Sequence, residues 1–229
     1  MHASETRATA YTTIGGDVVH ELEIKRSRFI TYLRRVDTEE QARELIAELR
    51  ATYHDARHHC SAFIVGADRG VQRSNDDGEP SGTAGAPMLE ALSRRVSHGT
   101  DADLSDVVAV VVRYFGGVLL GAGGLVRAYS ESVSTALDAA TFVRRQRMRL
   151  YDVATDLDVA PRLENDLRTQ QHRVLGTDYS PTASGLIRPV VRVAVPDEPA
   201  AAEALITQLA THSAGAAEAT QTGTEWVDL

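Results

Sequence analysis

The chain has 229 residues, of which 43% are hydrophobic and 24% are charged. This ordinary composition excludes collagen, coiled coil and global disorder. The longest purely aliphatic run, Val107 to Val112, is too short to span a bilayer, and the first ten residues are mostly polar, unlike a secretory leader. We therefore expect a cytoplasmic protein. The single cysteine excludes an intrachain disulfide framework and fits a reducing compartment.

The formal net charge of −8 is distributed unevenly along the chain. Residues 1–150 carry 19 Lys and Arg against 20 Asp and Glu, whereas residues 151–229 carry 5 against 12. The negative total argues against unspecific binding to nucleic acids. The nearly neutral first part could still present a basic face locally, so its charge leaves recognition of an anionic partner open.

The first half of the chain predicts a mixture of strands and helices from its apolar periodicity. In chain order these are strands at 17–25 and 28–36, a helix after Thr38, a strand at 57–66, a helix at 87–96, a strand at 107–114 and a long helix with an apolar stripe from 125 to 140. Thr38 and Gln41 form a capping box. Residues 67–86 are predicted to be a long polar loop, of the kind that often carries function.

The pattern changes after residue 150. The predicted elements are a strand at 151–159, a helix at 161–173, strands at 174–179 and 186–195, a helix at 198–212 and a strand at 217–227. This βαββαβ succession is the ferredoxin-like arrangement. We therefore predict an α+β protein with two domains, at 1–145 and 146–229, with the boundary near residues 144–150.

The run from His54 to Cys60 is the first candidate for chemistry. On a strand, His58 and Cys60 share one face, while Arg57 and His59 lie on the other. A cysteine nucleophile needs an exposed thiol with a lowered pKa, and a zinc site would need more cysteines or a separated histidine pair. Two interpretations stay open: a nucleophile with a histidine base, or a small buried thiol among hydrogen-bonded histidines.

The acidic loop from Asn75 to Gly85 is the second candidate. Its carboxylates could hold Mg²⁺ or Ca²⁺, or perform acid–base chemistry, but their spacing does not match a calcium loop. The proline and glycines instead favour a shaped turn in which Asp side chains cap backbone amides. The candidate residues here are His58, Asp76, Asp77 and Glu79. We assign no metal and no cofactor to them.

The third candidate is a strand, glycine-rich loop and helix at 113–127. Free amides at a helix N-terminus bind anions, although the sequence matches neither a P-loop nor a dinucleotide-binding fingerprint. Arg127 lies in the first helical turn, where the helix dipole disfavours a cation by about 0.3 to 1 kcal/mol. The glycines could also serve only for close packing. The predicted anion or RNA contacts are Arg57, His59, Arg113, Tyr114, Gly116, Gly117, Gly121, Gly123, Gly124 and Arg127.

A fourth candidate is the arginine-rich run at 144–149. In an extended chain, Arg145, Arg147 and Arg149 point to one side. They form either a stripe that follows a phosphate backbone or the charged protection of an edge strand.

Several motifs, in this order, resemble the IMPACT/YigZ family over about residues 20–135. They are Lys25-Arg26-Ser27-Arg28-Phe29, the run 55–60, the run 76–85, and Arg113 to Gly117 followed by 120–129. The resemblance implies an N-terminal domain similar to the second domain of a small-subunit ribosomal protein. It also implies that the two domains are similar to the last two of elongation factor G. Family members often have lysine where this chain has Ala86, and no catalytic residue is carried over.

The leading hypothesis is a cytoplasmic, translation-associated regulator. It would bind RNA, the ribosome or a translation-related protein through the anion-binding glycine-rich loop, with no membrane partner and no DNA specificity. One alternative is a hydrolase-type enzyme that uses the His/Cys cluster and the acidic loop. The other is a protein–protein adaptor whose acidic C-terminal domain selects the partner.

Overall fold

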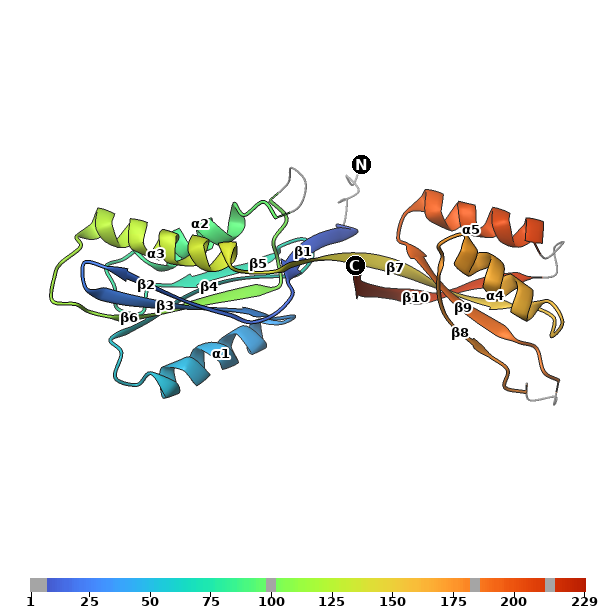
Figure 1. Cartoon of the computed structure of the whole chain (residues 1–229), viewed down its shortest axis with the longest axis horizontal. Coiled ribbons are helices and arrows are strands. Elements are labelled where there is room, and N and C mark those ends of the chain that lie inside the picture. The colour runs from blue at the N-terminus through green and yellow to red at the C-terminus, as the bar shows by residue number, and fades with distance from the viewer. Residues whose placement is uncertain (1–7, 98–101, 182–185, 213–216) are drawn as a thin grey trace, which may run out of the picture. The chain divides into compact units, whose positions relative to one another are not determined.

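The computed structural model describes residues 8–97, 102–181, 186–212 and 217–229. The chain divides into two compact units, Met1–Arg144 and Arg145–Leu229 (Figure 1). Both are mixed α/β units, and the described residues form two antiparallel sheets and five helices. The elements are β1 (Ala10–Ile14), β2 (Val18–Ile24), β3 (Ser27–Arg35), α1 (Glu39–Thr52), β4 (His58–Val65), β5 (Val71–Asn75), α2 (Gly85–Ser93), β6 (Val107–Tyr114), α3 (Ala122–Asp138), β7 (Phe142–Ala154), α4 (Ala160–Thr169), β8 (Arg173–Asp178), β9 (Val190–Pro196), α5 (Pro199–His212) and β10 (Glu218–Asp228).

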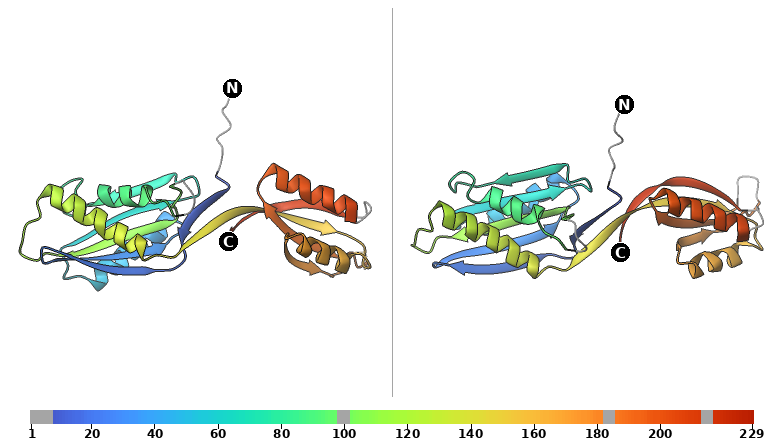
Figure 2. Two further views of the ribbon diagram at one scale, coloured as in Figure 1. Left: turned by 45° about the horizontal axis from the view of Figure 1, so that its top comes forward. Right: turned by 90° about the horizontal axis from the view of Figure 1, so that it is seen from above.

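The first unit is built on an antiparallel sheet with strand order β2-β3-β6-β4-β5. Helix α1 covers one face of this sheet, and α2 and α3 cover the other (Figures 1 and 2). The central strand β6 is therefore buried on both sides. Burial on both faces explains the nearly unbroken run of β-branched residues in β6. This run predicted a strand at 107–114, and β6 has these bounds.

The two long helices of this unit follow their predicted apolar stripes. Helix α1 begins after Thr38, whose hydroxyl accepts a hydrogen bond from the Gln41 amide at 3.3 Å. The Gln41 side chain accepts from the Asp37 amide instead of completing the capping box at Thr38. Helix α3 buries Leu125, Tyr129 and further residues of the stripe against the sheet.

Two local predictions in this unit are wrong, and one strand was missed. The supposed loop at 67–86 contains β5, which pairs with β4. The side chains of β5 are mostly exposed and polar. The sequence therefore shows no apolar alternation there, although backbone hydrogen bonds make the segment an edge strand. Strand β1 was not predicted at all. Helix α2 runs from Gly85 to Ser93, so it begins two residues before the predicted start at 87 and ends three residues before the predicted end at 96.

The second unit has the predicted succession of strand, helix, two strands, helix and strand. In its sheet β7 lies between β10 and β9, and β8 pairs with the other side of β9. Helices α4 and α5 share one core with one face of this sheet. Strand β7 begins at Phe142 instead of 151, and β9 begins at Val190 instead of 186.

The arginine run lies within β7, and its interpretation as an edge strand is wrong because β7 has a neighbour on each side. Arg147 and Arg149 both donate to the carboxylate of Asp197, and Arg145 pairs with Asp228. Each of these positive charges therefore has a carboxylate partner. This pairing weakens the alternative interpretation of the run as a phosphate-binding stripe.

Among the described residues, no helix has both the length and the apolar character that a membrane crossing requires.

Candidate functional site

The glycine-rich loop between β6 and α3 packs against the tight turn of the β2–β3 hairpin, at one end of the first unit (Figure 1). Both turn residues, Lys25 and Arg26, have left-handed backbones, with φ of +48° and +66°. A β-carbon added at Gly116 would lie 2.0 Å from the Arg26 carbonyl carbon and oxygen. The Gly116 amide donates to the Ser27 hydroxyl at 3.2 Å. Only glycine allows the two segments to approach this closely.

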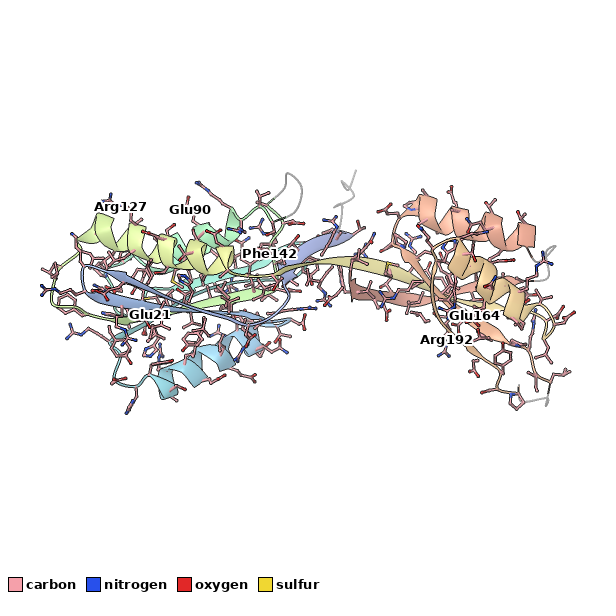
Figure 3. The ribbon with its side chains drawn as sticks, in the orientation of Figure 1. Glu21, Glu90, Arg127, Phe142, Glu164 and Arg192 are labelled. Carbon is pink, nitrogen blue, oxygen red and sulfur yellow. The ribbon has the colours of Figure 1, made fainter. Side chains whose placement is uncertain are left out.

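Helix α3 begins directly after this loop, with Gly121 at φ +73° as its N-cap. Among the described residues, no side chain caps its N-terminus, and its first turn has no acidic residue. Arg127 is exposed at this end of the helix (Figure 3), and its Nε bonds the Gly123 carbonyl at 3.3 Å. The first-turn amides therefore form a positive helix end, and this turn itself contributes no carboxylate.

A pocket of about 320 Å³ opens beside this helix end. Loop and helix residues supply an apolar wall, and four residues from other segments supply charge and hydrogen-bonding groups. Its lining comprises Arg57, His58, Glu79, Pro80, Arg113, Phe115, Leu119, Leu120, Gly121, Ala122 and Leu125. The pocket thus unites one end of the His/Cys cluster, the last acidic residue of the acidic loop, and the glycine-rich loop.

Beside this pocket lies a buried ion pair between Arg113 and Glu79. Arg113 Nη1 donates to Glu79 Oε1 at 2.5 Å, and the two side chains are only 6% and 4% exposed. The Tyr129 hydroxyl donates to the same oxygen at 2.8 Å. The guanidinium also lies over the rings of Phe29 and Phe115, 5.3 and 5.8 Å from their centroids. The charge of Arg113 is therefore already compensated by a carboxylate.

Arg57 is the exposed cation of the pocket wall. Within the ranges that the structure describes, no carboxylate pairs with its guanidinium, in contrast to Arg113. An exposed arginine without a carboxylate partner can bind an anion that reaches the pocket. Of the predicted contacts, Arg57 is therefore the exposed arginine that lines the pocket.

The two histidines of the cluster that lie on β4, His58 and His59, point to different environments, as their alternation on a strand predicts. His58 lines the pocket, and its Nδ1 lies 2.9 Å from the Asp77 carbonyl oxygen. His59 is buried away from the pocket lining, with Nε2 3.1 Å from the Tyr53 carbonyl. Asp77 accepts from the His59 amide at 2.6 Å and from Arg50 at 2.7 Å. His59 and Asp77 thus hold the strand entrance in place.

Asp76 acts as the cap that the turn interpretation predicts. Its carboxylate accepts from the amides of Gly82, Ala84 and Gly85, at 2.8, 3.0 and 2.8 Å. Burial alone would raise the pKa of Asp76, but these three donors together hold it below its usual value. No cluster of three or more His, Cys, Asp or Glu in the described part of the chain could hold a metal ion.

Cys60 lies in the core of the first unit, with Sγ 3.0 Å from the Asp76 carbonyl oxygen and 3.3 Å from the Tyr129 hydroxyl. Burial raises the pKa of its thiol to about 12. The thiol is therefore protonated at neutral pH, and the His/Cys hydrolase hypothesis lacks an activated nucleophile. The geometry favours the buried-thiol interpretation.

We expect the native thiol to react with a disulfide reagent at pH 8 at least about 100-fold more slowly than the unfolded chain. A folded-state pKa above the ordinary value of 9.0 means that the folded protein holds the proton more tightly. The contribution of Cys60 to stability is therefore present below pH 9 and is lost as the pH rises to about 12. Labelling with and without urea measures both rates. Fast labelling of the native protein would contradict the buried position.

Some predicted contacts lie outside the pocket. Gly123, Gly124 and Arg127 are on the exposed first turns of α3, next to the pocket residues Gly121 and Ala122. Gly116 and Gly117 belong to the loop but not to the lining. The Tyr114 hydroxyl donates to Asp55 at 2.8 Å instead of facing the loop.

The sequence reasoning missed Ser27, Tyr129 and the apolar wall of Pro80, Phe115, Leu119 and Leu120. Ser27 and Tyr129 lie within the motifs that carry the family resemblance. Those motifs were the only signal in the sequence for their role.

Comparison with known proteins agrees with these motifs. The Impact N-terminal domain matches residues 25–137. The chain is 44% identical to the IMPACT family member YvyE of Bacillus subtilis, over 75% of this chain and 76% of that protein. It is 40% identical to YigZ of Escherichia coli, over 69% and 74%. A crystal structure of a hypothetical protein matches with a TM-score of 0.59 and 34% identity, covering 93% of this chain and 98% of that one. The chain belongs to the IMPACT family.

Proposed function

We propose that this protein is a cytoplasmic, translation-associated factor whose first unit binds RNA. The observation that carries the proposal is the uncapped N-terminus of α3 beside a pocket with the unpaired, exposed Arg57 at its wall. Helix amides and an arginine together recognise phosphate, whereas the pocket's apolar wall suits an unstacked base. The family resemblance supports a role in translation.

Charge and exposure around the loop support RNA as the ligand. The two turn residues beside the loop, Lys25 and Arg26, are both basic and exposed. Phe115 is exposed as well and lines the pocket, so a ring is available for stacking. Single-stranded RNA is recognised by this combination of basic and aromatic groups.

The same proposal includes the finer fold assignment of the two units. The strand order β10-β7-β9-β8, with both helices on one face, supports a ferredoxin-like second unit. We propose that the first unit has the fold of the second domain of a small-subunit ribosomal protein. Under this assignment the ribosome, or the RNA within it, is the natural place for the protein to act.

We expect binding to single-stranded RNA to weaken steeply as salt rises, because phosphate contacts release counterions. Arg57→Glu should weaken the binding of all RNA sequences. It should also make the plot of log binding constant against log salt concentration less steep by about one unit of slope. Fluorescence anisotropy across a salt series measures both.

The matched control is Arg94→Glu, at the residue that follows α2, because the Arg94 side chain is 81% exposed and lies outside the pocket. It makes the same charge change in the same unit. Salt-independent binding, or equal losses in the two variants, would overturn RNA binding at this site.

A further inference from the structure

The pocket beside α3 contains hydrogen-bond acceptors that the phosphate contacts do not use. Glu79 accepts from Arg113 and Tyr129, and both bonds go to the same oxygen, Oε1. Among the described residues, none donates a hydrogen bond to the other oxygen, Oε2. A carboxylate that is 4% exposed, lines a pocket and retains an unpartnered oxygen can accept from a ligand.

His58 supplies a second acceptor next to this carboxylate. Its Nδ1 lies 2.9 Å from a carbonyl oxygen, which can only accept, so Nδ1 carries the proton. In the neutral imidazole, Nε2 is then the acceptor, and it lies 3.9 Å from Glu79 Oε1. The lining therefore pairs two acceptors and suits a ligand with two neighbouring donors on one edge.

The charge of the lining indicates what kind of donor fits. Arg113 neutralises Glu79, and Arg57 adds one further positive charge, so the pocket does not favour a cationic ligand. A ligand that has two neutral hydrogen-bond donors on one edge and also carries an anionic group would match both the two acceptors and the positive charge of the lining. The anionic group would meet Arg57 and the first turn of α3, to which the lining residues Gly121 and Ala122 belong.

The shape of the pocket restricts the ligand further. Its volume of about 320 Å³ is at the lower end for small-molecule sites, and suits a single ring system better than an extended ligand. Phe115, Leu119 and Leu120 supply an apolar wall for the flat faces of such a ring. A flat ring with two adjacent N–H donors and a phosphate is a guanine nucleotide, whose N1–H and 2-amino group lie on one edge.

We infer that this pocket is a guanine-specific site, which takes either a free guanine nucleotide or an unpaired guanine of RNA. Glu79 and His58 accept from the guanine edge, the loop side chains contact the ring, and Arg57 and the α3 amides bind the phosphate. The inference rests on the proposed function where the ligand is RNA, and it adds the identity of the base to that function.

The test uses the full chain and calorimetric titration with guanosine, inosine and adenosine 5′-monophosphates. Inosine lacks the 2-amino group, and adenosine lacks both donors and offers an acceptor at N1. We expect guanosine monophosphate to bind most tightly, the inosine analogue roughly 10-fold more weakly, and the adenosine analogue roughly 100-fold more weakly or not at all. Equal affinities for the three would overturn guanine recognition.

A rim variant tests the location without disturbing the buried ion pair. Leu119 is 83% exposed, so Leu119→Glu should fold normally and place a carboxylate where the nucleotide enters. We expect a loss of guanosine monophosphate affinity of about 10-fold or more. The control is Val19→Glu on β2, which makes the same change at a side chain that is 62% exposed and outside the pocket. Equal effects of the two variants would place the site elsewhere.

Two RNA ligands separate this inference from the proposed function. An unstructured oligonucleotide with one central guanine is compared with the same oligonucleotide carrying adenine there. A preference for guanine that Leu119→Glu abolishes supports the pocket as an RNA base site. Tight but equal binding of both RNAs would overturn guanine recognition and leave RNA binding intact. Binding of the free nucleotide without binding of either RNA would refute the proposed function and retain the pocket.

Discussion

Glu79→Ala is expected to lower the unfolding free energy of the first unit by about 3 to 5 kcal/mol. The reason is the charge that it leaves behind: Arg113 is 6% exposed and would lose its carboxylate partner. Tyr129 would lose its acceptor as well. Replacing both partners, as in Glu79→Leu with Arg113→Met, should recover much of this loss because no unpaired charge stays buried.

The two units can be followed separately in one unfolding experiment. The single cysteine, Cys60, lies in the core of the first unit, and the single tryptophan, Trp226, lies in β10 of the second. Thiol accessibility in a urea series therefore reports the first transition, and tryptophan fluorescence reports the second. The fluorescence transition should not move in Glu79→Ala.

The matched control is Glu21→Ala (Figure 3), because Glu21 also pairs with an arginine but is half exposed. An exposed ion pair of this kind contributes about 0 to 1 kcal/mol. Equal effects of the two substitutions would mean that water reaches the Glu79–Arg113 pair in solution.

Gly116→Ala should be nearly as damaging, with a loss of about 3 kcal/mol or more in the first unit. The new β-carbon would lie 2.0 Å from the Arg26 carbonyl and 2.4 Å from the Ser27 nitrogen. These are backbone atoms of a tight hairpin turn, so no side-chain rotation can relieve the overlap. The loop must lift away from the turn, and the hydrogen bond from the Gly116 amide to Ser27 is lost.

Gly123→Ala provides the comparison on the same segment. A β-carbon at Gly123 would meet nothing within 4 Å, and the position lies in a helix, where alanine is favoured over glycine. We expect stability to be unchanged or raised by up to about 1 kcal/mol. The same thiol-accessibility transition measures both variants. A Gly116→Ala protein as stable as the Gly123→Ala protein would show that the loop does not pack on the turn.

The elements that the sequence predicts well are those whose signal is local. Strand β6 is predicted by an unbroken run of apolar residues, and α3 by apolar residues at helical spacing, and each pattern lies within one segment. Strand β5 escaped prediction because its five residues, Val71–Asn75, are largely polar, and pairing with β4 is a property of the backbone. For the arginine run in β7, the sequence indicates an extended segment but not its neighbours, because the carboxylates that pair with Arg145 and Arg147 lie far away in the chain.

The candidate site was predictable in its parts but not in its assembly. Arg113 and the glycines are visible in the sequence, whereas the partner of Arg113 lies 34 residues away and that of Tyr129 lies 50 residues away. The need for glycine at 116 arises from a turn 90 residues earlier in the chain. Nothing local to either segment encodes such an approach.

The fixed contact at Gly116 also has a consequence for binding. It anchors the start of the loop to the hairpin turn, and the first helical turn begins at its other end. The span between them, residues 117–120, contains Leu119 and Leu120 of the apolar wall. Because both ends of this span are held, ordering it around a ligand in the proposed site would cost less conformational entropy than ordering a loop without such anchors.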